Sequence, residues 1–403
     1  MLGCFDKAAF LFQLENRMKR NLSLFLFLIT IASCDPVRDS TFVPINHASQ
    51  DEKTLVYSHS KVIEIDSISL PFYDYFQILE KEGKDWLIGM NRQNLSLDFI
   101  PLEDSLSIGH LFFEEDGPGS VSADLDIFHF FTEDSIITIQ DRSRKIDVLN
   151  RNGALQNTIR TNLKDTQGLE MYPVSYSYLG QWPLFSDSVW ILPVYPDLDV
   201  KSKIYYNRNK FVVYDPVRNQ VKHEFGAYPD RYKQDRYFDI LREPSLTAAA
   251  KGSFLVTFPA DPGVYEYRLG SDTVHYHQYP DWERFENEGI DRDAAMQEFV
   301  NHYISTAWLQ QMVYDPYRKV YYRFAKEKQE LRKADGEKKT AYDADWKVFV
   351  LDSDLNPVGE YALDAVRFNP MFSFVSEEGL IIYDNQRDHE DQMVLGVFRL
   401  TDK

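Results

Sequence analysis

The chain has 403 residues, of which 44% are hydrophobic and 15% aromatic, so it can bury a large core. Its formal net charge of −19 argues against nucleic acid as a partner, because phosphate binding needs a basic surface. Both cysteines, Cys4 and Cys34, precede the globular part, which excludes disulfides, thiolate nucleophiles and cysteine-bound metals from the remaining residues.

The N-terminal segment has the pattern of a bacterial export signal. A short basic region at 18–20 is followed by an apolar stretch, 22–31, that is shorter than an ordinary membrane-spanning helix. Residues 31–34, Ile-Ala-Ser-Cys, resemble the lipobox of bacterial lipoproteins, in which the cysteine receives the lipid. An ordinary cleaved signal with an incidental cysteine is the alternative. We predict a mis-assigned extension at 1–17, a signal peptide at 18–33, lipidation of Cys34, a lipidated polar tether at 34–53 and a folded region at 54–403.

Short apolar strands separated by tight turns repeat along the folded region. The unit is clearest at 133–159, where a polar turn and the pair Asn152-Gly153 separate three apolar runs. Such a unit cannot bury both of its faces alone, so its recurrence is typical of radially arranged sheets. The second strand of each unit is predicted to begin at Trp86, Ile136, Val189, Phe254, Val320 and Leu380.

The last unit ends near Leu400 with only three strands, and an unpaired strand, 62–65, lies near the start of the folded region. A closed ring would use that strand to complete the last blade and would remove both free sheet edges. We therefore predict an all-β fold, a six-bladed β-propeller with one helical insertion near 285–304. Seven blades are the alternative if the region 281–313 contains a further strand pair.

Long connections gather at one end of the predicted blades. In an up-and-down blade, the connections between second and third strands and those between blades share one end, which we call the long-loop face. Insertions on one face mark the binding face of a repeat protein, whereas neutral drift of loop length is the alternative. The long connections are 114–125, 194–210, 226–244, 279–306, 326–345 and 385–392.

Two of these insertions have patterns of their own. Residues 291–304 place their apolar side chains on one helical stripe, which predicts a helix packed on the rim, with partner binding as the alternative. Residues 326–339 are almost all charged and predict a solvated hairpin or helical excursion.

Aromatic and arginine side chains on the long-loop face would suit a glycan, a peptide or an envelope protein. Loop carboxylates near the channel, such as Asp141 and Asp384, would suit a glycosidase, which needs two facing carboxylates. The binding-face candidates are Asp141, Arg142, Arg144, Tyr195, Tyr205, Arg236, Tyr237, Trp282, Asp384, Arg387 and His389.

Metal and cofactor chemistry has little support in the sequence. His275 and His277 alternate on a predicted outermost strand, as a metal pair would, but a third ligand is lacking and structural histidines are the stronger interpretation. Residues 388–391 (Asp-His-Glu-Asp) lack the spacing of a calcium loop and predict a solvated charge run. Phosphate loops, nucleophile elbows and zinc-helix motifs are absent, so we predict no catalytic residue, metal or cofactor.

An Asp-Ser/Thr-aliphatic tripeptide recurs along the chain and resembles the O-glycosylation sequon of Bacteroidetes-type envelope proteins. Asp and Ser also form turns before strands, which is the alternative interpretation. The tripeptides begin at Asp66, Asp104, Asp134, Asp187 and Asp272.

The lipobox, the tether, the turn Gly117-Pro118-Gly119 and the repeats of 54–403 together resemble an uncharacterised family of Bacteroidetes lipoproteins. Its members look like six-bladed propellers of TolB/NHL-like type. The resemblance implies a lipid-anchored protein of the cell envelope, at the outer membrane and facing either the periplasm or the surface. It implies no catalytic residue. The first hypothesis is therefore a non-enzymatic binding or scaffold protein, and the alternative is a glycan-active hydrolase or lyase.

Overall fold

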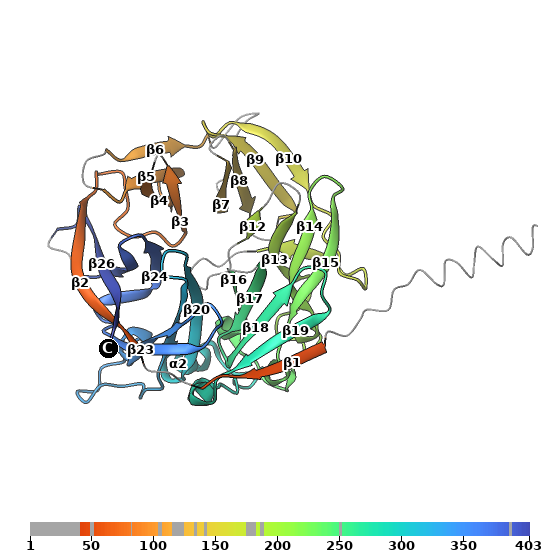
Figure 1. The fold of residues 1–403 in the computed structure, drawn as a ribbon. Coiled ribbons are helices and arrows are strands. Elements are labelled where there is room, and N and C mark those ends of the chain that lie inside the picture. The colour runs from red at the N-terminus through yellow and green to blue at the C-terminus, as the bar shows by residue number, and fades with distance from the viewer. Residues whose placement is uncertain are drawn as a thin grey trace, which may run out of the picture. The chain divides into compact units, whose positions relative to one another are not determined.

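A computed structural model describes residues 41–48, 52–81, 83–103, 107–114, 125–132, 135–140, 143–174, 183–185, 189–249, 252–386 and 389–403. The chain divides into two compact units, Met1–Thr41 and Phe42–Lys403, and the fold below is that of the second. Four separate sheets and one eight-stranded sheet follow one another around a propeller-like ring (Figure 1). Within the described ranges, no helix is long and apolar enough to span a membrane.

The first two sheets are four-stranded antiparallel meanders, as the repeat predicts. Ile136, Ile139 and Ile146 are almost fully buried, which explains why these β-branched runs form strands. Gly153 adopts a φ of +79° in the turn between the third and fourth strands of the second sheet, a conformation that favours glycine. The strands are β3 (Phe76–Lys81), β4 (Lys84–Asn91), β5 (Ser96–Pro101) and β6 (Gly109–Phe112), then β7 (Leu125–Thr132), β8 (Ser135–Gln140), β9 (Lys145–Asn150) and β10 (Leu155–Arg160).

The third and fourth sheets each depart from a simple four-stranded meander. In the third sheet, two short strands, β11 and β12, both pair with β13. In the fourth sheet, β1 pairs outside β19, so β19 is not the outermost strand that the sequence predicted. β1 also lies inside the segment predicted as a tether. The strands are β11 (Met171–Pro173), β12 (Leu184–Phe185), β13 (Trp190–Pro196), β14 (Asn209–Asp215) and β15 (Gln220–Ala227), then β16 (Ser245–Ala248), β17 (Ser253–Phe258), β18 (Asp261–Arg268), β19 (Thr273–Gln278) and β1 (Thr41–Asn46).

The eight-stranded sheet joins the start of the ring to its end. β2 pairs antiparallel with β26 from Lys53–Asp402 to Glu64–Gln392, and Val62 lies opposite Val394, which confirms the predicted pairing. β2 meets β23 at a single parallel pair, Lys53–Gly359. The sheet therefore consists of two four-stranded halves in contact at one point. In sheet order the strands are β20 (Trp308–Asp315), β21 (Val320–Lys326), β22 (Trp346–Leu351), β23 (Pro357–Leu363), β2 (Lys53–Glu64), β26 (Gln392–Asp402), β25 (Gly379–Asp384) and β24 (Phe368–Ser376).

Helical elements lie in the long connections. The predicted insertion contains one α-helix, which begins at Met296 rather than Asp291 because the side chain of Asp291 caps a turn by accepting from the Asp293 backbone N–H. The charged excursion forms a hairpin, with an isolated bridge between Arg332 and Lys338. The helices are α2 (Met296–Ser305) and the 3₁₀ segments η2 (Tyr205–Asn207), η3 (Asp230–Lys233), η4 (Asp239–Arg242), η5 (Pro280–Phe285) and η6 (Ala341–Asp343).

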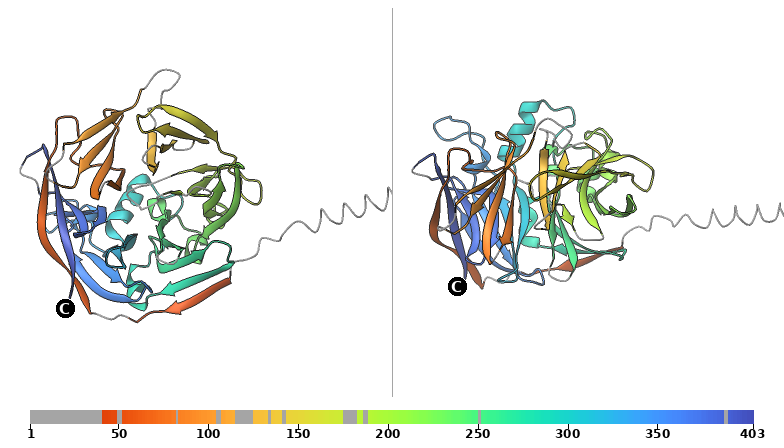
Figure 2. Two further views of the ribbon diagram at one scale, coloured as in Figure 1. Left: turned by 45° about the horizontal axis from the view of Figure 1, so that its top comes forward. Right: turned by 90° about the horizontal axis from the view of Figure 1, so that it is seen from above.

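The two ends of the ring differ. Strand alternation puts the connection containing α2 on the long-loop face. The turns between first and second strands, and those between third and fourth strands, lie on the opposite side, which we call the short-loop side. Seen edge-on, α2 stands at one side of the ring, whereas β1 and the C-terminus lie towards the other (Figure 2, right).

The pairing of β2 with β26 can be tested with a disulfide across it. Val56 and Arg399 are exposed, directly opposed residues, and the part of the chain after Cys34 has no competing thiol. We expect oxidised Val56→Cys/Arg399→Cys to unfold at higher urea concentration than its reduced form, by about 2–4 kcal/mol, because the crosslink restricts the unfolded chain. If the disulfide forms but the midpoint of urea unfolding does not change, the ring does not depend on the pairing of β2 with β26 for its closure. Val56→Cys alone is the control.

Candidate functional site

Insertions of the third and fourth sheets meet around one buried lysine on the long-loop face. Lys210, at the start of β14, is completely buried. Its Nζ lies 3.9 Å from the ring centroid of Tyr195, 5.2 Å from that of Tyr205 and 6.0 Å from that of Tyr228. It also donates a 2.9 Å hydrogen bond to the Tyr205 hydroxyl. The ammonium is thus held by the faces of aromatic rings, a favourable electrostatic contact.

The carboxylate of Glu243 forms ion pairs with both Lys210 and Arg242. Glu243, buried like Lys210, lies 3.5 Å from the Lys210 ammonium and 2.8 Å from Nε of Arg242. Burial lowers the pKa of Lys210 to about 7, although the charge of Glu243 acts in the opposite direction. Burial would also lower the pKa of Arg242, but the charge of Glu243, together with Tyr195, Tyr205 and Tyr237, raises that pKa. We call Lys210, Arg242, Glu243, Tyr195 and Tyr205 the Lys210 cluster.

A second layer ties the cluster to α2. The Lys201 ammonium lies 5.2 Å from the ring centroid of Phe299 and 5.6 Å from that of Tyr237. Arg292 donates to the backbone carbonyl of Lys201 and pairs with Asp235 at 3.2 Å. Three insertions, 194–210, 226–244 and 279–306, are therefore fixed to one another by charged and aromatic contacts.

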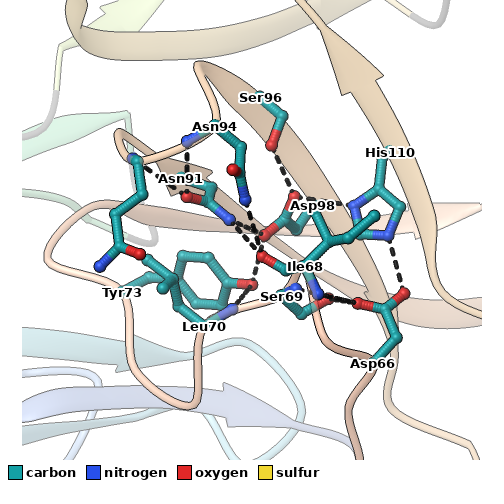
Figure 3. A network of polar contacts seen from close by, with 11 residues as sticks. Asp66, Ile68, Ser69, Leu70, Tyr73, Asn91, Asn94, Ser96, Asp98 and His110 are labelled. Atoms are coloured by element: carbon teal, nitrogen blue, oxygen red, sulfur yellow. Dashed lines mark hydrogen bonds and ion pairs between the residues drawn. The ribbon is translucent and has the colours of Figure 1, made fainter.

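A separate polar network anchors the chain where β2 leads into the first sheet (Figure 3). Asp98, fully buried, accepts hydrogen bonds from Tyr73, Asn91 and Ser96, and its Oδ1 lies 2.9 Å from Nδ1 of His110. Nε2 of the same imidazole lies 2.8 Å from Asp66 Oδ2. His110 therefore bridges two carboxylates, one from the connection after β2 and one from β5.

This arrangement suits structure rather than catalysis. Burial would lower the pKa of His110, but the hydrogen bonds and charges of Asp98 and Asp66 raise it. Burial would raise the pKa of Asp66, but hydrogen bonds from His110 and from the backbone of Ser69 and Ile68 lower it to about 2. Because each imidazole nitrogen faces a carboxylate, neither nitrogen can act as a base towards a substrate. Ser96 donates to Asp98 rather than to the imidazole.

A family model described as a domain of unknown function, DUF4221, matches residues 52–362. The chain belongs to the DUF4221 family. A solved member from Bacteroides vulgatus superposes with a TM-score of 0.73 at 19% identity, covering 88% of this chain and all of that one. A Bacteroides fragilis structure described as a putative exported protein gives a TM-score of 0.52 at 11% identity, covering 90% of this chain and all of that one. A search of curated proteins found no match.

In this DUF4221 protein, all four predicted aromatic candidates are inside the fold. Tyr195 and Tyr205 belong to the Lys210 cluster, and Tyr237 lies in the layer next to it. Trp282 is buried against Tyr279, with ring centroids 4.1 Å apart. These rings brace the long loops and are not available at the surface to stack on a ligand.

The predicted polar candidates are dispersed. Arg144 pairs with Glu170, and its guanidinium lies 5.0 Å from the Tyr172 ring. Asp384 is buried and forms an ion pair with Arg367, in which the guanidinium nitrogen lies 2.8 Å from the carboxylate oxygen. Arg236 and His389 are exposed, whereas Asp141, Arg142 and Arg387 lie outside the described residues.

Lys210, Arg242 and Glu243 are not among the residues that the sequence predicts for the site. Strand alternation offered one signal, because Lys210 shares a strand face with Val212 and Tyr214, and all three are fully buried. Nothing local distinguishes Arg242 and Glu243, since their burial depends on three separate insertions meeting.

The histidines of β19 also have structural contacts. Nε2 of His277 lies 3.4 Å from Glu266, and its Nδ1 lies 2.8 Å from Nε2 of His47, just after β1. His275 approaches the same carboxylate at 3.4 Å. Across the described part of the chain, no group of three or more His, Cys, Asp or Glu side chains could hold a metal ion.

The tripeptide at Asp66 forms a turn. Its carboxylate accepts from the backbone N–H of Ile68 and Ser69, which agrees with the turn-forming interpretation. Asp272 lies in the exposed turn before β19, and Asp104, Asp134 and Asp187 lie outside the described residues. O-Glycosylation of Ser67, which is exposed, stays a prediction.

The charge on His110 should make stability depend on pH. Because its folded pKa is raised, the stabilisation is complete below the unfolded value of about 6.5 and is lost as pH rises through the folded pKa. We expect His110→Gln to lower the free energy of unfolding by about 2 kcal/mol at pH 6, as for a hydrogen bond to a buried charge, and by less at pH 9. Urea unfolding at both pH values measures this, with exposed His389→Gln as control. An equal loss at both would contradict a charged His110.

Lys210 should have the opposite dependence. Its pKa falls from 10.5 to about 7 on folding, so at this residue the unfolded chain binds more protons between these values, and the contribution of Lys210 to stability rises with pH there. Lys210→Met removes this dependence. The difference in free energy of unfolding between Lys210→Met and wild type should therefore shift in favour of the variant by about 1–2 kcal/mol when the pH is lowered from 9 to 7. Lys203→Met, at an exposed position, should leave the pH profile unchanged. Parallel profiles for wild type and Lys210→Met would show that the lysine does not titrate in this range.

Proposed function

We propose that this protein is a lipid-anchored propeller of the cell envelope that binds a protein or peptide partner through its long-loop face without catalysing a reaction. Counting the two halves of the eight-stranded sheet separately, beside the other four sheets, supports a propeller of six blades. The export signal and the cysteine of the lipobox support an envelope location with Cys34 as the lipidated residue. The description of the Bacteroides fragilis neighbour as an exported protein agrees with this location.

Exposed aliphatic side chains on braced loops are the observation that carries the binding proposal. Met296 is 74% exposed and Val300 is 41% exposed, and because they are four residues apart they share one face of α2. Ile204, at the start of η2, is 52% exposed. The Lys210 cluster and its second layer hold these loops in place, so the loops lose little conformational entropy when a partner binds.

The chemistry of this surface favours a protein over a glycan. Sugar rings pack on exposed aromatic faces, but Tyr195, Tyr205 and Tyr237 are buried. The exposed aliphatic side chains, with the exposed Arg236 in another connection of the same face, instead resemble the mixed surface of a protein interface. An apolar segment of a partner could cover Met296 and Val300.

The loop carboxylates do not favour the hydrolase alternative. A glycosidase needs two carboxyl groups that face the scissile bond. Asp384 is buried and bound by Arg367, and Asp261 is buried and bound by Arg231 at 3.2 Å. These side chains are engaged in structural ion pairs.

The proposal can be tested at α2. A photo-crosslinking amino acid at Gln297, next to Met296, should yield a discrete adduct in cells, and mass spectrometry identifies the partner. Met296→Asp/Val300→Asp should weaken binding of that purified partner at least tenfold, because two charges would have to be desolvated. The thermal midpoint should stay unchanged, since both side chains are exposed.

Val217→Asp is the matched control, because Val217 is 86% exposed in the turn between β14 and β15 on the short-loop side. Equal binding by both variants would overturn the assignment of the surface. Turnover in a glycan panel by the wild type would overturn the non-enzymatic proposal.

A further inference from the structure

We infer that the β1 edge of the fourth sheet faces the membrane surface and that the long-loop face points away from it. The inference rests on the proposed lipidation of Cys34 and adds an orientation to it. It follows from the length of chain between the anchor and the fold, from the direction of β1, and from the charge and apolarity of the surfaces concerned.

The chain between the anchor and the fold is short. Seven residue steps separate Cys34 from Thr41, the first residue of β1, and fully extended they span about 25 Å at most. A compact body of 362 residues, the length of Phe42–Lys403, has a diameter of roughly 50 Å. The anchor therefore cannot reach around the ring, and the side on which β1 begins must lie near the lipid.

The direction of β1 identifies that side. His47 directly follows β1; its backbone N–H donates to the Gln278 carbonyl at 3.0 Å, and its ring stacks on Tyr279 at 5.2 Å. Since the end of β1 meets the end of β19, β1 can pair with β19 only by running in the same direction. Its first residues therefore lie beside Thr273, next to the short turn between β18 and β19. That turn belongs to the short-loop side.

Surface chemistry agrees with this orientation. Phe42 is 48% exposed and Val43 is 39% exposed at the start of β1, and Leu269 in the adjacent turn is 44% exposed. These side chains can lie against a lipid surface, where burial of apolar area is favourable.

The short-loop side also carries a strongly acidic cleft, which is formed by the first sheet and by strands β24 and β25 rather than by the fourth sheet. It lies between the β3–β4 and β24–β25 turns, has a volume of about 280 Å³, and also includes Lys61. An anionic lipid surface would repel it, so we expect the ring to lean towards the membrane on its β1 edge. Its carboxylates are Glu80, Asp85, Glu103, Glu377 and Glu378.

Fluorophores on single cysteines can test the orientation, because the chain has no thiol after Cys34 and lipidation blocks that sulfur. Leu269→Cys places a label beside β1, and Gln297→Cys places one on α2. The full chain, extracted from the envelope, is reconstituted in vesicles of phosphatidylethanolamine and phosphatidylglycerol that carry a headgroup quencher. We expect several-fold stronger quenching at position 269 than at 297. Phe42→Ser/Val43→Ser should reduce the quenching at 269.

Two results would overturn the inference in distinguishable ways. An unmodified Cys34 in the mass spectrum of the mature N-terminal peptide would remove the anchor, and the proposed envelope attachment would fail with it. A lipidated Cys34 with equal quenching at both positions, or stronger quenching at 297, would overturn the orientation alone and leave the proposed function intact.

Discussion

The antiparallel pairing of β2 with β26 is the constraint on which the ring depends. Without it, both ends of the ring would expose long strand edges, which are prone to non-native pairing. Polar networks hold β2 in place at and after its end. Ser60 on β2 donates to Asp384, which also pairs with Arg367, and the Asp66–His110–Asp98 network fixes the connection that follows β2. Closure is thus secured by directional contacts as well as by strand pairing.

Closure in turn separates the two ends of the ring. Apart from β1 and β2, the strands of each sheet follow one another antiparallel, so alternation decides which connections share a side. The Lys210 cluster and its second layer connect three of the long connections to one another. Burying a lysine and an arginine around one glutamate is energetically costly. We infer that the cluster is kept for the position it gives to α2 and η2 rather than for stability.

The sequence predicted those parts of the fold that depend on local pattern. The six second strands are β-branched or aromatic runs between turn residues, and each of them is a strand. β1 escaped prediction because Pro44 and polar neighbours weaken the strand signal, although an edge strand tolerates proline. The burial of Tyr195 and Glu243 depends on contacts between insertions far apart in the chain, and no local pattern encodes it.

If Cys34 is lipidated as proposed, the opposite placement of the anchor and of the proposed binding surface would restrict the kind of partner. Seen edge-on, α2 stands at one side of the ring and β1 lies towards the other (Figure 2, right), so with the β1 edge at the membrane α2 would point away from the lipid. A partner buried in the same membrane would have to extend past the ring to reach Met296 and Val300. A soluble partner, or the soluble domain of an envelope protein, meets this surface directly. A short tether would hold the proposed binding surface at a fixed height, and the braced loops would hold its shape. Both would reduce the entropy that is lost when a partner binds.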